Sequence, residues 1–131
     1  MIYKYRFFFF VGFLFFLVTI LMGEIYRGWI INSQVNDFGF SGVAPSFFST
    51  VSFIFFAAYI KKRVLATTEF LACVLGCVVY EAIQPYIGLG VFDLGDVSAI
   101  LFGGVLSFLL LNILHKVCSL DDNIINKTQN N

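Results

Sequence analysis

The sequence predicts an all-α integral membrane protein with four transmembrane helices in a small up-down bundle. Hydrophobic residues make up 60% of the 131 residues and charged residues only 12%, whereas soluble domains carry about 25% charged residues. The mean hydropathy is +0.91. The apolar residues gather in four long runs separated by short polar stretches. Lipid is the solvent in which such runs are stable, so the bilayer is the first partner that the composition predicts.

The first predicted span covers residues 7–22, an uninterrupted apolar run that follows Lys4 and Arg6. A basic start before an apolar run also describes a secretory signal peptide. The run is long for a signal peptide, and Leu21-Met22-Gly23 is a poor cleavage site because two of its residues are large. We therefore predict an uncleaved transmembrane helix.

The second predicted span covers residues 44–60. Residues 23–45 before it are mixed in character and are predicted to form a loop, with a short helix lying in the membrane interface as the alternative. Pro45 fits the first position of a helix, where its missing N–H does no harm. The basic run Lys61-Lys62-Arg63 ends the span.

The third and fourth predicted spans cover residues 64–84 and 97–114. Pro85 disfavours helical backbone at the residue before it and so ends the third span. Residues 85–96 then form a glycine-rich hairpin. The four spans make one domain, 1–116, and the polar tail 117–131 is predicted to be disordered.

The basic residues predict the orientation of this bundle. Seven of the eight Lys and Arg residues fall on one side of a four-span topology, and cytoplasmic loops are the ones enriched in these residues. Both termini are therefore predicted to be cytoplasmic. The seven are Lys4, Arg6, Lys61, Lys62, Arg63, Lys116 and Lys127, and the exception is Arg27.

Four polar side chains on the predicted outer side form the candidate polar site: Glu81, Gln84, Asp93 and Asp96. They lie between the last two apolar runs, so that three of the eight acids fall within sixteen residues. Ionisable groups at the edge of a membrane are costly and point to function. A simpler interpretation is available for each one, since an Asp at a helix start is commonly a cap. Only one of the two Asp residues can cap the same helix start well.

Small residues predict how the helices that carry this site meet. In lipid, close helix contact needs small side chains. The fourth span has Ala99, Gly103 and Ser107 at four-residue spacing, and the third has Ala72 and Gly76. We predict a tight hairpin of these two spans, small surface against small surface. Cys73 and Cys77 share a face of the third span and are predicted to be packing residues.

The stretch 79–107 resembles the signature of the VanZ-like family of small bacterial membrane proteins. The resemblance is carried by Tyr80-Glu81-Ala82-Ile83-Gln84, by Phe92-Asp93-Leu94-Gly95-Asp96 and by Gly103. It implies a multi-pass protein of the bacterial cytoplasmic membrane with a role in the cell envelope. The family name comes from an accessory of resistance to the glycopeptide teicoplanin, so the resemblance also implies a link to envelope antibiotics.

Two positions depart from the family pattern. Family members often carry an Arg where this chain has Gly90, and an Asn where it has Ile100. An Arg is the natural clamp for a phosphate or a carboxylate. Its absence weakens a prediction of phosphate chemistry at this position.

Three functions follow from these observations. The first is a non-enzymatic envelope protein whose polar site binds a lipid head group, a cation or a membrane-protein partner. The second is a membrane enzyme that uses Glu81 and Asp96 as acid and base on an envelope precursor. The third is a small transporter subunit. The only histidine, His115, is predicted at the opposite membrane face from the polar site.

No cofactor is predicted, although the cluster of oxygen ligands makes a divalent cation conceivable. The cysteines lack the further ligands that a zinc site needs, so no metal site is established. The net charge is zero, which argues against nucleic acid as a partner.

Overall fold

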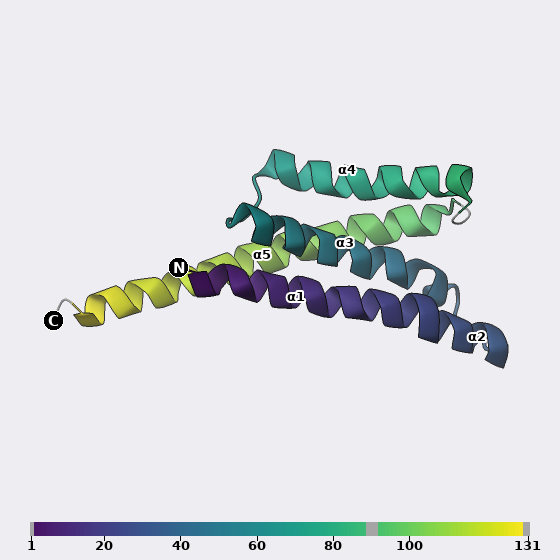
Figure 1. Cartoon of the computed structure of the whole chain (residues 1–131), viewed down its shortest axis with the longest axis horizontal. Helices are drawn as coiled ribbons and strands as arrows, with labels where there is room; N and C mark the ends of the chain where they lie inside the picture. Colours follow the sequence, from purple (N-terminus) through teal and green to yellow (C-terminus); the bar gives the residue numbers. More distant parts are fainter. Residues whose placement is uncertain (1, 89–91, 130–131) are drawn as a thin grey trace.

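The structure is a computed structural model that describes residues 2–88 and 92–129, with the side chains of residues 5–88 and 92–117. Every regular element in these residues is helical. Four helical stretches are long and apolar enough to cross a membrane, which confirms the predicted fold class. Successive stretches run in opposite directions, and both ends of the chain lie at the same end of the bundle (Figure 1). The stretches are Tyr5–Ser33, Phe40–Lys61, Thr67–Ile87 and Leu94–Val117.

The first helical stretch is longer than predicted. Helix α1 (Ile2–Ile20) continues through a π-helical turn (Leu21–Tyr26) into α2 (Arg27–Ser33). An uninterrupted loop over 23–45 is therefore wrong, and the segment contains the short helix α2, here as a continuation of the first span. Polar side chains do not end a helix when the backbone remains free to continue it. This helix ends only where Gln34 takes a left-handed conformation with φ 52°.

Asp37 sets the start of the second stretch, α3 (Phe40–Lys61). Its carboxylate accepts hydrogen bonds from the Gly39 N–H at 3.1 Å and the Ser41 N–H at 2.6 Å. The Ser41 hydroxyl and backbone bonds hold the pKa of Asp37 below its ordinary value of 3.8. Because this cap starts the helix at Phe40, Pro45 lies inside the helix and not at its first position as predicted.

Helix α3 is the centre of the bundle. The Ser52 hydroxyl donates a buried hydrogen bond of 2.9 Å to the carbonyl oxygen of Gly12 on α1. A side chain on Gly12 would lie 3.2 Å from the Phe56 ring, so glycine permits this approach. Such polar contacts and close packing hold helices together in lipid. The core around them consists of Phe8, Val51, Ile54, Phe55, Ala58 and Leu111.

The predicted small-residue stripe of α5 (Leu94–Gln129), formed by Ala99, Gly103 and Ser107, packs against α3 and not against α4. A Cβ on Gly103 would lie 2.8 Å from the Phe47 carbonyl oxygen, and Ala99 and Ser107 are buried. A Cβ on Gly76 would meet no atom within 4 Å. The predicted partner of the stripe, the surface of Ala72 and Gly76, is therefore wrong. The reason is that α3 exposes its own backbone at Phe47, which only a glycine can approach so closely.

Helix α4 (Thr67–Ile83) is peripheral, and a short 3-10 helix (Gln84–Ile87) continues it. It begins three residues later than the predicted span. Val74 approaches Gly104 of α5, where a Cβ would lie 3.0 Å from the valine methyl group. Of the described side chains of α4, Glu81 alone is buried. A polar contact therefore anchors the outer end of a helix that has little apolar packing.

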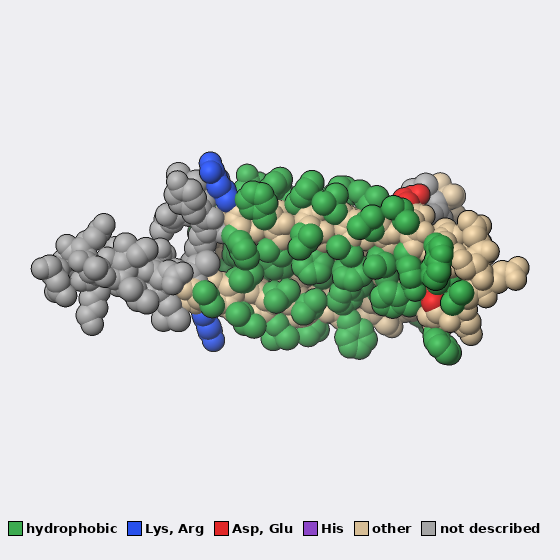
Figure 2. Space-filling model, turned by 90° about the horizontal axis from the view of Figure 1, so that it is seen from below, with side chains coloured by type: hydrophobic (Ala, Val, Ile, Leu, Met, Phe, Trp, Pro, Cys, Tyr) green, Lys and Arg blue, Asp and Glu red, His purple; other side chains and the backbone are tan. Residues whose placement is uncertain are grey.

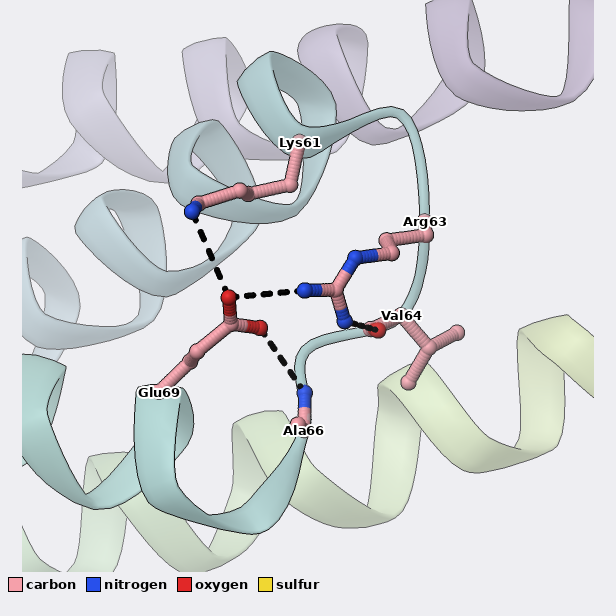
Figure 3. A network of polar contacts seen from close by, with 5 residues as sticks. All are labelled: Lys61, Arg63, Val64, Ala66 and Glu69. Atoms are coloured by element: carbon pink, nitrogen blue, oxygen red, sulfur yellow. Dashed lines mark hydrogen bonds and ion pairs between the residues drawn. The ribbon is translucent and has the colours of Figure 1, made fainter.

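The loop before α4 is closed by Glu69 (Figure 3). Its carboxylate lies 2.8 Å from the Arg63 guanidinium and 3.3 Å from the Lys61 ammonium. It also accepts a hydrogen bond of 3.1 Å from the Ala66 N–H. This last bond is half of a capping box, which satisfies a free donor at the helix start.

Helix α5 is longer than the predicted span 97–114 at both ends. It begins at Leu94, and it continues to Gln129 through the segment 117–131 that was predicted to be disordered. Adding residues to an existing helix costs little compared with starting one, so a helix can extend past the apolar segment that anchors it.

Charged side chains are separated along the molecule. One face shows a continuous hydrophobic middle, with Lys and Arg at one end and Asp and Glu at the other (Figure 2). The basic end is the one where the chain termini lie (Figures 1 and 2). Which end faces the cytoplasm stays a prediction from the distribution of basic residues.

Candidate functional site

A polar cavity lies at the acidic end of the bundle, where α2, α3, α4 and α5 come together. Its volume is ≈ 650 Å³, within the roughly 300–1,000 Å³ of small-molecule sites. All four residues of the predicted polar site line it. The full lining is Thr19, Arg27, Gly42, Pro45, Ser46, Ser49, Tyr80, Glu81, Gln84, Phe92, Asp93 and Asp96.

Glu81 is the most enclosed of the acids, with 7% of its surface exposed. It lies in the last turn of α4, three residues before Gln84, so the two side chains are neighbours on the helix surface. The Gln84 amide donates a hydrogen bond of 2.6 Å to Glu81 Oε2. The other carboxylate oxygen, Oε1, lies 3.1 Å from the hydroxyl oxygen of Ser46 on α3.

Ser46 joins three helices through one hydroxyl group. Its Oγ also lies 2.9 Å from Oδ1 of Asp96, in the first turn of α5. A serine hydroxyl has one proton and can donate to only one of these carboxylates. The second contact is a hydrogen bond when that carboxyl group is protonated and donates to Oγ. The geometry therefore accommodates one extra proton on the Glu81/Asp96 pair.

Asp93 and Asp96 have different structural roles. It directly precedes α5, and its Oδ1 accepts a hydrogen bond of 2.9 Å from the Gly95 N–H. Its carbonyl oxygen accepts another of 3.1 Å from the Asp96 N–H. Asp93 is thus the cap of α5. Because Asp93 caps the helix, the Asp96 side chain is not needed as a cap and faces Ser46.

Arg27, like Ser46, lines the cavity although the sequence did not predict it there. It lines the cavity together with Thr19, which lies eight residues earlier on the same long helix. Eight residues of regular α-helix turn by about 800°, or 80° beyond two full turns. The wider π turn between them reduces this drift and keeps both residues on one face. Its position as the single basic residue outside the basic end was the signal that could have identified it.

The Arg27 guanidinium has no carboxylate within ion-pair distance in the described part of the chain. The ion pairs found there both involve Glu69, at the other end of α4. Arg27 therefore brings a positive charge to a cavity with three acids without being neutralised by direct contact.

An apolar groove adjoins the polar cavity between α3 and α4. Its volume is ≈ 530 Å³, and it shares Ser49, Tyr80 and Glu81 with the polar cavity. The groove exists because α4 does not pack closely on α3 along its length. Its other lining residues are Thr50, Phe53, Ala72, Cys73, Gly76, Cys77 and Ile100.

Several predictions concern residues outside this arrangement. His115 lies nineteen residues after Asp96 on α5, about 28 Å along the helix axis. Ile100, which replaces the family's Asn, is buried with 1% exposure and lines the apolar groove. Gly90 lies outside the described residues. In the described part of the chain, no group of three His, Cys, Asp or Glu side chains is placed to hold a metal ion.

Comparisons with models of protein families, with curated proteins and with solved structures find no match to this chain.

Proposed function

We propose that this chain is a VanZ-like protein of the bacterial cell envelope that binds a polar head group without catalysing a reaction. The proposal places it in the cytoplasmic membrane, with both termini inside and the polar cavity facing outward. It is carried by one observation above all. The Ser46 hydroxyl joins Glu81 and Asp96 from two other helices, in a cavity that also contains Arg27.

Two features favour binding over catalysis. The hydroxyl of Ser46 lies between two carboxylates and has no histidine near it to act as base, since His115 lies far along α5. The cavity offers both a positive and a negative side, which suits recognition of a charged group. We infer an effect on tolerance to glycopeptide antibiotics from the family resemblance.

Complementation of a deletion strain tests the proposed function. We expect Glu81→Gln and Asp96→Asn to fail to restore growth with a glycopeptide antibiotic, although both proteins accumulate normally in the membrane. Glu69→Gln, at the opposite end of α4, is the matched control and should complement fully. Full complementation by the first two variants at equal protein level would reduce the polar site to a structural role.

Two further measurements address the alternatives. Purified protein is incubated with envelope precursors, and a new product that Glu81→Gln abolishes would establish the enzyme in place of the binding protein. A reporter fused after Leu114 should read as cytoplasmic. An external reading would overturn the orientation.

A further inference from the structure

The apolar groove and the polar cavity are two parts of one elongated space. They share Ser49, Tyr80 and Glu81, so the space runs from the membrane-spanning part of α3 and α4 to the polar end of the bundle. The groove is lined almost wholly by apolar and small side chains, whereas the cavity is lined by charged ones. An occupant that fits both parts has an apolar chain and a charged head.

The charges of the cavity specify that head group. Glu81, Asp93 and Asp96 face one cation, Arg27. The three carboxyl groups of the cavity outnumber its single guanidinium group. A head group with only a phosphate would suit Arg27 but would meet an excess of carboxylates. A head group that also carries a cation matches both sides of the cavity.

The hydrogen-bond acceptors of the cavity favour a primary ammonium group as the cation of the head group. Carboxylates accept hydrogen bonds, and a primary ammonium group offers three donors. A quaternary ammonium group offers none and is typically held by several aromatic rings. Tyr80 and Phe92 are the aromatic side chains among the described lining of the cavity, which otherwise consists of Gly42, Pro45 and hydroxyl, amide and charged side chains.

We propose that this space binds a phospholipid whose head group carries a phosphate and a primary amine. Its acyl chain lies in the groove between α3 and α4, its phosphate lies against Arg27, and its ammonium lies among Glu81, Asp93 and Asp96. This inference rests on the proposed function and names the ligand class for the same cavity.

Gly76 and Gly28 provide a matched pair for testing the groove. A Cβ on either glycine meets no atom within 4 Å, so a side chain can begin at either position without a clash. Gly76 lines the groove, whereas Gly28 lines neither part of the space. Gly76→Phe should fill the groove, and Gly28→Phe adds the same ring elsewhere.

Native mass spectrometry of the purified full chain with added lipids measures the binding. We expect phosphatidylethanolamine to bind at least about tenfold more tightly than phosphatidylcholine of the same acyl chains, because the charge-assisted hydrogen bonds of the ammonium are lost in the latter. Gly76→Phe and Arg27→Gln should each weaken this binding about tenfold. Gly28→Phe and Lys62→Gln, which removes a positive charge at the other end, should leave it unchanged.

A photoactivatable group in the acyl chain gives a readout that does not depend on the variants folding. Crosslinks should concentrate on the peptides that contain Phe53 and Gly76. Equal binding of the two lipids, or crosslinks spread evenly over α1 and α5, would overturn the inference. If Glu81→Gln still abolishes complementation in that case, the proposed head-group function survives with another ligand class. If Glu81→Gln complements fully as well, both proposals fail.

Discussion

The two ends of α4 each carry a glutamate, and the two residues have opposite surroundings. Glu69, in the first turn, is partly exposed and lies against two cations and a backbone donor (Figure 3). Glu81, in the last turn, is buried and contacts a hydroxyl and an amide, with no cation in ion-pair distance among the described residues. The first closes a loop, and the second joins helices across a cavity.

Glu69 therefore binds groups near it in sequence, whereas Glu81 lines a cavity that a ligand can enter. The partners of Glu69 lie within eight residues of it in sequence. Ser46 lies 35 residues from Glu81 and 50 from Asp96. A local contact needs no tertiary structure to form, whereas a bridge between distant segments requires the whole bundle and is expected to contribute more to its stability.

Ser46→Ala should have the largest effect on stability. It removes the hydroxyl between two carboxylates and leaves them facing each other, so we expect a loss of about 1.5–3 kcal/mol in the free energy of unfolding. Titration with a denaturing detergent, followed by the fluorescence of Trp29, measures it. Ser49→Ala is the control, because the Ser49 hydroxyl bonds only the Ser46 carbonyl oxygen, at 3.1 Å. Equal losses in the two variants would contradict the role of the bridge.

Replacing the Glu81 carboxylate by an amide should preserve the stability of the fold, whereas removing the side chain should lower it. Glu81→Ala leaves Ser46 and Gln84 without their partner and should cost about 1–3 kcal/mol of unfolding free energy. Glu81→Gln resembles a protonated glutamate, as it can both donate and accept, and should change stability by less than about 0.5 kcal/mol. The same detergent titration compares them. A large loss in Glu81→Gln would exclude a shared proton on the Glu81/Asp96 pair.

Glu69→Gln should have a smaller effect that depends on salt. Exposed ion pairs contribute about 0–1 kcal/mol and are screened by ions in solution. We expect the difference in unfolding free energy between this variant and the native chain to shrink as salt is raised. The loss in Ser46→Ala should not change with salt. Because glutamine can still accept the Ala66 N–H, a loss in Glu69→Gln that persists at high salt would contradict its origin in the ion pairs.

Asp37→Asn should have the smallest effect, a loss of stability near neutral pH that disappears in acid. The pKa of Asp37 is lower in the folded chain than its ordinary value of 3.8, because Ser41 bonds favour the ionised form. Its contribution to stability is therefore present above that value and is lost as the pH falls through the lower, folded-state pKa. When the free energy of unfolding is measured from about pH 6 downward, the native chain should show an acid-dependent decrease that the variant lacks. An unchanged acid profile would contradict this origin.

The four long apolar helices were predicted well because helix length and hydrophobicity depend on local composition. The four apolar runs all became helices, and the errors lie at their ends. Residues 23–33 were predicted as a loop because Glu24 and Arg27 are polar, but a polar side chain at the edge of a membrane does not interrupt backbone hydrogen bonding. The same holds for the start of α3, which Asp37 sets from outside the apolar run.

The candidate site was predicted in part. Glu81, Gln84, Asp93 and Asp96 lie close together in sequence and were expected to meet, and they line one cavity. Ser46 and Arg27 were not identified, because each is an ordinary residue in its own segment. A serine after Pro45 and an arginine near the end of a span acquire significance only from the segments packed against them.

By itself, the sequence determined that the chain forms four membrane-crossing helices with its acids gathered between the last two. Those properties follow from hydrophobicity and from the spacing of residues along the chain. Only the tertiary structure decided that Ala99, Gly103 and Ser107 pack on α3, that α4 stands apart over a groove, and that Ser46 and Arg27 join the acids. In lipid, apolar surface does not discriminate between neighbours, so the choice depends on close backbone approach and on interhelical hydrogen bonds. Both are properties of pairs of surfaces, which no single segment of sequence contains.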